Sequence, residues 1–293
     1  VPVRSRATKR GLALPRIFRY PLPMNTSRMT PASRPTPALP VFSLLLPELQ
    51  KALAEEGYTV PTPIQNQALP PLLEGRDVLG CAQTGTGKTA AFVLPILQTL
   101  IRNPRPPVPG QARVLILAPT RELAAQIGES IRAYGRYVPV RHTVMFGGVG
   151  QGPQVAAMKR GMDILVATPG RLLDLMNQGF VRLSGVEIFV LDEADRMLDM
   201  GFIHDIRRVI AALPARRQSL FFSATLAPEI VQLSRTLVHH PVHITIEPEQ
   251  PTIALIAQKV MFVDKGHKPA LLVSLLKDPA INRVIVFTQM KHA

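Results

Sequence analysis

Short apolar runs alternate with helical stretches along much of this chain, and this alternation constrains its fold more than any other feature. Strands that alternate with helices form βαβ units, in which parallel strands are buried on both faces. The sequence therefore predicts an α/β fold with a mostly parallel sheet covered by helices on both faces. The predicted strands are 77–82, 113–118, 142–146, 163–167, 187–191, 219–222 and 242–246.

Six of these strands are followed at once by a small, glycine-bearing or charged cluster. In chain order the clusters read QTGTGKT, PTREL, GGVG, TPGR, DEAD and SAT. In open parallel sheets, ligands bind at the carboxyl ends of the strands. We therefore expect all six clusters to lie along one edge of the sheet and to form a single site.

The segment AQTGTGKT, residues 82–89, has the context of a phosphate-binding loop, because it follows a strand and opens a helix. Gly85 and Gly87 would let backbone N–H groups turn toward phosphate oxygens. Lys88 would bind the β- and γ-phosphates, and Thr89 would give its hydroxyl to Mg²⁺. The first position is Ala82 instead of the usual glycine. The competing interpretation is a glycine-rich turn between a strand and a helix.

The run FVLDEAD, residues 189–195, ends a buried strand in three crowded carboxylates. Like charges in a dry site are costly unless something positive lies opposite them. Asp192 is placed to hold Mg²⁺, mainly through water, and Glu193 to orient and deprotonate an attacking water. The alternative is that Asp192 and Asp195 only cap the following helix.

The formal charge of +14 is unevenly distributed. Residues 1–40 contain eight Lys or Arg, eight Pro and no acid, so they are predicted to form a disordered basic arm that attracts polyanions. The competing interpretation is a solvated tail without a specific role. A single cysteine, Cys81, excludes a disulfide framework. With no apolar run long enough for a membrane span, we expect a cytoplasmic protein.

Taken in order, the motifs AQTGTGKT, PTREL, GG, TPGR, DEAD and SAT resemble those of the DEAD-box RNA helicases. GYTVPTPIQ, residues 57–65, resembles their Q motif, and VIVFTQMKHA, residues 284–293, resembles motif IV of their second RecA-like domain. DEADRMLDMGF resembles the bacterial RhlE-type branch. The resemblance covers residues 42–293 and implies a RecA-like ATP-binding domain, with ATP and Mg²⁺ as cofactors and RNA as the partner.

The resemblance also implies a role for each matching residue. Coupling of ATP hydrolysis to RNA would involve Asp195, Ser223, Ala224 and Thr225, with Ser223 and Thr225 acting through contacts with Asp195. Sequence-independent contacts to the RNA backbone would come from Pro119, Thr120, Arg121, Gly148, Thr168, Pro169, Gly170 and Arg171. ATP binding would involve Phe42, Tyr58, Thr62, Gln65, Ala82, Thr84, Gly85, Thr86, Gly87, Lys88 and Thr89. Within this set Gln65 would read adenine, Phe42 would stack on the base, and Tyr58 and Thr62 would support the loop.

Each role has a simpler competitor. Pro119 and Thr120 could begin a helix, the two glycines at 147 and 148 could form a tight turn, and Ser223 and Thr225 could be capping hydroxyls. Singly these alternatives are strong. Six such clusters at six strand ends favour the functional interpretation.

The predicted organisation is an arm over 1–40, a helicase ATP-binding domain over 41–246, a linker over 247–257 and the start of a second RecA-like domain over 258–293. The last part is expected to contain a strand (258–263), a helix (266–277) and a strand (283–287). Motifs V and VI of the family do not occur in these residues. Because these motifs are absent, we expect this chain to be truncated. Their arginines contact the γ-phosphate in the family, so we also expect the chain to hydrolyse ATP poorly.

Two other functions stay open. The chain could be a non-catalytic RNA-binding fragment, in which the arm matters more than the nucleotide site. It could also be a DNA-directed ATPase on the same fold. The first would lose RNA affinity when residues 1–40 are deleted, and the second would prefer DNA to matched RNA.

Overall fold

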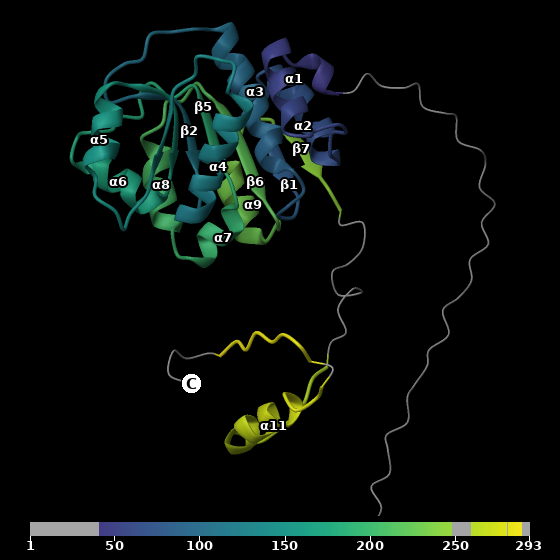
Figure 1. Ribbon diagram of the computed structural model, residues 1–293. Coiled ribbons are helices and arrows are strands. Elements are labelled where there is room, and N and C mark those ends of the chain that lie inside the picture. Colours follow the sequence, from purple (N-terminus) through teal and green to yellow (C-terminus); the bar gives the residue numbers. More distant parts are fainter. Residues whose placement is uncertain (1–40, 248–258, 280, 289–293) are drawn as a thin grey trace, which may run out of the picture. The chain divides into compact units, whose positions relative to one another are not determined.

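The computed structural model describes residues 41–247, 259–279 and 281–288. In the first of these ranges, seven strands form one sheet in the order β3-β4-β2-β5-β6-β1-β7 (Figure 1). Every strand pairing in it is parallel. The strands are β1 (Val78–Cys81), β2 (Ala112–Leu117), β3 (His142–Met145), β4 (Met162–Ala167), β5 (Ile188–Leu191), β6 (Gln218–Ser223) and β7 (Val242–Thr245). The predicted parallel sheet is confirmed, with each strand placed within about a residue or two of its expected bounds.

Helices cover both faces of the sheet, as predicted. One face packs against η1 (Val41–Leu44), α1 (Pro47–Glu55), α2 (Pro63–Leu73), α3 (Lys88–Arg102) and α4 (Arg121–Tyr134). The other packs against α5 (Gly152–Lys159), α6 (Pro169–Asn177), α7 (Ala194–Asp199), α8 (Ile203–Ala211) and α9 (Pro228–Arg235).

Alternation along the strands explains why two cores form. In β5, Ile188 and Val190 belong to the first core, whereas Phe189 and Leu191 belong to the second. Successive side chains of a strand point to opposite faces, so a continuous apolar run supplies both layers at once. This is why these strands read as unbroken apolar runs in the sequence.

Two helices continue through prolines that could have broken them. Pro70 and Pro71 lie inside α2, and Pro95 lies inside α3. Each proline removes one helical hydrogen bond. Pro71 and Pro95 are buried in the packed layer, where apolar contacts offset that loss.

The parallel arrangement brings all the carboxyl ends of the strands to one edge. Along this edge the clusters after β3, β4 and β2 (GGVG, TPGR and PTREL) occupy one half. The clusters after β5, β6 and β1 (DEAD, SAT and the phosphate loop) occupy the other half. The predicted single edge is confirmed, and the strand order separates the expected RNA motifs from the expected nucleotide motifs.

The C-terminal part departs from the prediction. Its helix is present as α11 (Lys268–Leu275), preceded by η2 (Lys265–His267). The predicted strands 258–263 and 283–287 were wrong, because residues 259–263 and 283–287 form no strand. A strand needs a neighbour for its backbone hydrogen bonds, and no described residue pairs with either segment. Phe262 and Phe287 are accordingly almost fully exposed.

The predicted arm over 1–40 and most of the predicted linker lie outside the described residues. Within the described ranges, none of the helices has both the length and the apolar character needed to cross a bilayer.

Candidate active site

The phosphate loop follows β1 and leads into α3. Gly85 and Gly87 have φ values of +87° and +93°, in the left-handed region that favours glycine. Lys88 is buried, and its ammonium donates a hydrogen bond of 2.7 Å to the carbonyl oxygen of Ala82. The loop therefore closes on its own lysine, which holds a positive charge beneath the glycine-rich turn.

The acidic cluster begins directly after β5. Asp192 and Glu193 are buried, with 2% and 7% of their surfaces exposed. Glu193 has φ 52° and ψ 52°, a conformation that is uncommon for a residue with a side chain. Such strain persists only where the surroundings impose it, and it is common at functional sites. The strand-to-helix turn at Glu193 is therefore a strained position that faces the phosphate loop.

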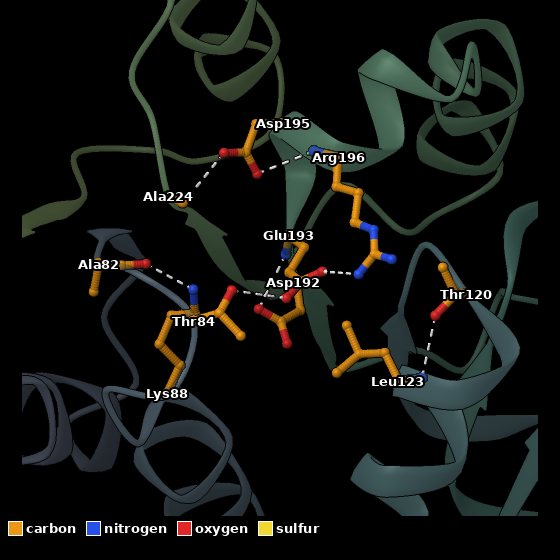
Figure 2. A network of polar contacts seen from close by, with 10 residues as sticks. All are labelled: Ala82, Thr84, Lys88, Thr120, Leu123, Asp192, Glu193, Asp195, Arg196 and Ala224. Carbon is orange, nitrogen blue, oxygen red and sulfur yellow. Dashed lines mark hydrogen bonds and ion pairs between the residues drawn. The ribbon is translucent and has the colours of Figure 1, made fainter. Parts of the chain in front are cut away.

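Contacts on both sides hold the Glu193 carboxylate (Figure 2). Thr84 of the phosphate loop donates its hydroxyl to Oε1 at 3.2 Å, and Arg196 of α7 donates Nη1 to Oε2 at 3.1 Å. The first contact ties the acidic cluster to the phosphate loop across β6, which lies between β5 and β1. Arg196 was missed from the sequence, although its i,i+3 spacing from Glu193 at a helix start was the available signal.

Asp192 lies in the driest part of the cluster. The pKa of its carboxyl is raised to about 6, mainly by burial; the Lys88 ammonium lowers this pKa, and the nearby Glu193 carboxylate adds to the increase. Among the described residues, the only hydrogen-bond donor to its carboxylate is the N–H of Glu193, at 3.0 Å. Few protein groups therefore stabilise the ionised carboxylate of Asp192, and a cation bound beside it would do so.

This pKa gives a prediction for the nucleotide-free protein. Between pH 6 and the ordinary carboxyl pKa of 3.8, folded Asp192 binds a proton that the unfolded chain does not. Its contribution to stability therefore improves as pH falls through 6 and is lost as pH rises. Asp192→Asn should stabilise the protein at pH 7.5 by about 3 kcal/mol at most, with the advantage shrinking toward pH 4.5.

Denaturant unfolding of both proteins at pH 7.5, 6 and 4.5 measures this difference. Asp199→Asn, which removes an exposed carboxylate at the end of α7, is the matched control and should show no such pH dependence. Equal stability of the Asp192→Asn variant and the parent at all three pH values would contradict the argument.

Asp195 faces away from the other two carboxylates. Its Oδ2 accepts hydrogen bonds from the N–H of Ala224 (3.1 Å) and from the hydroxyl of Thr225 (3.3 Å), both directly after β6. Its Oδ1 accepts from the N–H of Arg196 (3.0 Å), a backbone donor in the first turn of α7 (Figure 2). The predicted contacts of Asp195 with Thr225 are therefore present. The predicted contact with Ser223 is absent, because the Ser223 hydroxyl is buried without any partner.

The residues fit a magnesium ion that is carried by a nucleotide. Among the described residues, no group of three His, Cys, Asp or Glu side chains could hold a metal by itself. Mg²⁺ usually keeps several waters and takes one or two carboxylates together with substrate phosphates. Buried Asp192 and half-buried Thr89 at the start of α3 are donors of that type.

The Q-motif residues pack directly on the phosphate loop. Gln65 is fully buried; its Oε1 accepts from the N–H of Thr62 (2.9 Å), and its Nε2 donates to the carbonyl of Gly87 (3.2 Å). A Cβ at Gly87 would lie 2.6 Å from Gln65 Nε2, so only glycine fits there. Gln65 thereby links α2 to the phosphate loop. Its predicted adenine contact stays a prediction.

An aromatic row lies beside this motif. Phe42 meets Tyr58 edge to face with 6.4 Å between ring centroids, and Tyr58 meets Tyr134 at 5.7 Å. The two tyrosine hydroxyls are 2.7 Å apart, and burial raises the pKa of Tyr134. Tyr134 gave no sequence signal, because it is separated from Tyr58 by 76 positions. Phe42 is partly buried in this row, and its predicted stacking on a base stays a prediction.

The expected RNA half contains two arginines held at adjacent clusters. The Arg121 guanidinium lies so close to Gly148 that a Cβ at that position would collide with it. Arg171 donates to the carbonyl of Val149 at 3.0 Å and to Gln154 at 3.3 Å. The structure therefore joins the clusters after β2, β3 and β4, which are separate in sequence.

Several other members of the RNA set have local roles. Thr120 caps α4 by accepting from the N–H of Leu123 at 3.2 Å, so the simpler alternative for this residue is observed. Thr168 and Pro169 begin α6, where both are buried, and Pro119 is buried at the end of β2. Gly148 and Gly170 are exposed.

The sequence of this chain is similar to those of known helicases. The DEAD/DEAH box helicase family matches residues 62–233. Over 251 residues, the chain is 42% identical to the ATP-dependent RNA helicase RhlB of Haemophilus influenzae, covering 85% of this chain and 60% of that protein. Over 249 residues it is 40% identical to the ATP-dependent rRNA helicase RRP3 of Mycosarcoma maydis, covering 85% of this chain and 44% of that protein.

Among solved structures, the fold resembles a hypothetical ATP-dependent RNA helicase from Sulfolobus tokodaii. The TM-score is 0.62 at 37% identity, over 68% of this chain and 56% of that one. The chain spans about half the length of the curated relatives that it matches. The family matches residues 62–233, and its six motif clusters lie on one edge of a RecA-like sheet. The chain therefore belongs to the DEAD/DEAH box helicase family.

Proposed function

We propose that this chain is the ATP-binding part of an ATP-dependent RNA helicase, which remodels short RNA duplexes. One observation carries the proposal: the acidic cluster contacts both of its neighbours on the nucleotide half of the edge. Glu193 accepts from Thr84 of the phosphate loop, and Asp195 accepts from Ala224 and Thr225. A change in the nucleotide can therefore alter the end of β6 through a single rigid turn.

In the proposed reaction, Lys88 leaves the Ala82 carbonyl to bind phosphate, and Gln65 recognises adenine. Thr89 and Asp192 would hold Mg²⁺, with Asp192 acting mainly through water. When bound, the ion neutralises charge on the phosphates and orients them. Glu193 would position the attacking water and accept its proton, since its carboxylate already lies within hydrogen-bond distance of the phosphate loop.

The other half of the edge would bind RNA through its sugar-phosphate backbone. Arg121 and Arg171 supply guanidinium groups, and Thr168 and Gly170 supply a hydroxyl and an exposed backbone. Such groups contact phosphates without reading sequence. Contacts with the 2′-hydroxyl would favour RNA over DNA.

The proposal also covers the organisation of the whole protein. Residues 41–246 form the ATP-binding domain, residues 247–257 would be a linker, and residues 258–293 would begin a second RecA-like domain. Exposed apolar side chains in the last part, such as Phe262 and Phe287, are what an incomplete core would leave. The RhlE-type branch and a cytoplasmic location are parts of the same proposal.

Two binding assays test this function on the chain of 293 residues. A fluorescent ATP analogue with Mg²⁺ reports the nucleotide half, and anisotropy of a labelled single-stranded RNA reports the RNA half. Arg121→Ala should weaken RNA binding about equally for all sequences and reduce the salt slope by about 1, with ATP binding unchanged. Arg235→Ala, an exposed arginine on α9, is the matched control.

The alternatives predict different results. If deletion of residues 1–40 abolishes RNA binding while Arg121→Ala and added ATP change nothing, the chain is a non-catalytic binding module. If a DNA oligonucleotide of the same sequence binds more tightly than the RNA, the DNA-directed ATPase is favoured instead.

A further inference from the structure

The edge of the sheet opposite the candidate active site carries an unexpected concentration of arginine. Seven segments lead from a helix back into the next strand, and together they form this amino edge: 74–78, 103–113, 135–142, 160–163, 178–188, 212–218 and 236–242. They contain nine arginines, no lysine and four acids. The rest of residues 41–247 contains eleven basic and thirteen acidic residues.

The positive charge of this domain therefore lies on the side away from the expected RNA motifs. The carboxyl edge holds Asp192, Glu193 and Asp195 in addition to its few cations. The strands are four to six residues long, which places the two edges roughly 13–20 Å apart. At physiological salt the Debye length is about 8 Å, so the amino edge acts as a separate electrostatic surface.

Compensation of helix dipoles does not account for these arginines. Cations offset a helix dipole only within its last turn. The last turns of α3 and α5 already contain Arg102 and Lys159, which are not among the nine. Apart from Arg160, which is the C-cap of α5, the arginines of the amino edge lie beyond the helix ends.

Only some of the nine arginines have ion-pair partners. Arg113 is buried and forms a two-pronged contact with Glu187 at 2.9 and 3.0 Å, and Arg105 shares the same carboxylate. Arg136 pairs with Glu55 and Glu56 of α1. Within the described residues, no ion pair is formed by five exposed members: Arg76, Arg141, Arg160, Arg182 and Arg216.

A hollow at the centre of this edge concentrates the charge. It has a volume of about 620 Å³ and is lined by Arg105, Arg216, Arg217, Glu187, Gln218 and Gly75. The Glu187 carboxylate is engaged by Arg105 and Arg113, so it adds little free negative charge. The Nε of Arg217 is buried without a hydrogen-bond partner, which leaves an unused donor at the hollow.

The composition of the surface favours a phosphate backbone over a protein partner. Guanidinium groups form paired hydrogen bonds with phosphate oxygens. Protein interfaces need apolar or aromatic anchors at their centre. In the seven segments the exposed large apolar side chains are Val108 and Tyr137, and the Tyr137 ring is covered by the Lys51 ammonium at 4.1 Å.

The same composition argues for double-stranded RNA. Proteins that hold single strands stack the bases on aromatic rings. Among the described residues of these segments, the exposed aromatic rings are that of Tyr137, which has the Lys51 ammonium over one face, and the imidazoles of His239 and His240, which precede the edge strand β7 and do not line the hollow. Duplex RNA is bound largely through its phosphates and its shape. We propose that the amino edge, centred on Arg76, Arg105, Arg216 and Arg217, is a second RNA site that holds the backbone of a duplex flanking the unwinding site. This inference rests on the proposed function, since it takes RNA as the substrate.

The test compares two RNAs on the whole chain, so that residues 1–40 are the same throughout. One is a short single strand, and the other is that strand extended by a stable hairpin. Arg76→Glu/Arg216→Glu should weaken binding of the hairpin RNA by about tenfold and reduce its salt slope by about 2, because two phosphate contacts are lost. Binding of the single strand should change less than about twofold.

Arg207→Glu/Arg208→Glu on the exposed surface of α8 is the matched control, with the same change of net charge. It should leave the hairpin preference intact. Arg76→Gln/Arg216→Gln should give an intermediate loss, and thermal unfolding should show that the variants are folded.

Three results would overturn the inference. These are an equal loss for both RNAs, an equal loss in the α8 control, or polyglutamate binding that depends on Arg76 and Arg216 as strongly as hairpin binding does. The last would assign the edge to acidic protein segments. Failure of the proposed function appears separately, as single-strand binding that is insensitive to Arg121→Ala.

Discussion

Replacing Lys88 by alanine is expected to weaken ATP binding severely, with a loss of about 30-fold to 4,000-fold in affinity. A phosphate that loses its charged partner in a desolvated site costs about 2–5 kcal/mol, and tenfold in affinity corresponds to about 1.4 kcal/mol. Titration with a fluorescent ATP analogue in the presence of Mg²⁺ measures the effect. Lys88 is the buried cation of the loop, so no neighbouring lysine can replace it.

The structure adds a second consequence of this change. The Lys88 ammonium lowers the pKa of buried Asp192, so its loss should raise that pKa further above its present value of about 6. Lys159→Ala, at the exposed end of α5, is the matched control and should bind ATP like the parent. Unchanged affinity in the Lys88→Ala variant would refute the phosphate-loop assignment, and with it the proposed function.

Glu193→Gln is expected to separate binding from hydrolysis. The glutamine keeps the shape of the side chain and can still contact Thr84 and Arg196, so ATP affinity should change little. It cannot accept a proton from water, and general-base catalysis typically contributes about 10²–10⁴-fold in rate. Single-turnover hydrolysis of radiolabelled ATP by the variant should fall by about that factor relative to the parent chain.

Asp199→Asn supplies a control for loss of a nearby carboxylate, because Asp199 is exposed at the end of the same helix. Its hydrolysis rate should match that of the parent. A Glu193→Gln variant that hydrolyses ATP as fast as the parent would show that another group activates the water. Asp192 would be the next candidate, since it lies beside Glu193 and its raised pKa suits a proton acceptor near neutral pH.

The three carboxylates that follow Leu191 point in different directions and have different partners. Asp195 turns toward the end of β6, where Ala224 and Thr225 donate to it. Glu193 is shared between Thr84 and Arg196, and only Asp192 is left without a strong donor in a dry site. A cation is therefore needed opposite one carboxylate, and the other two are satisfied within the protein. The remaining repulsion acts on Asp192, whose pKa is raised mainly by burial and also by the Glu193 and Asp195 carboxylates.

The cluster of arginines at the amino edge could not be predicted from the distribution of charge along the sequence. The net charge drew attention to residues 1–40, where eight basic residues are contiguous with no acid. The nine arginines of the amino edge are spread over more than 140 positions, with acids between them, and give no local run. They gather because every helix in a parallel α/β fold returns the chain to the same edge.

Local pattern was sufficient for the sheet, the helices and the six clusters. A buried parallel strand needs an apolar run, a glycine-rich turn needs glycine, and a helix start favours residues such as Thr120, so each leaves a mark in a few adjacent residues. The terminal strands at 258–263 and 283–287 failed for the complementary reason. An apolar run becomes a strand only when a neighbour accepts its backbone hydrogen bonds, and the described residues contain none.

By itself, then, the sequence determined the fold class and the edge on which the motifs meet, and it singled out Lys88, Asp192 and Glu193 as candidate site residues. Tertiary structure alone decided which partners those groups have: Thr84 and Arg196 for Glu193, Ala224 for Asp195, Tyr134 for Tyr58. The physical reason is that strand order, β5 beside β6 and β6 beside β1, sets the distances between side chains far apart in sequence. Hydrogen bonds and charges act over those distances, and not along the chain.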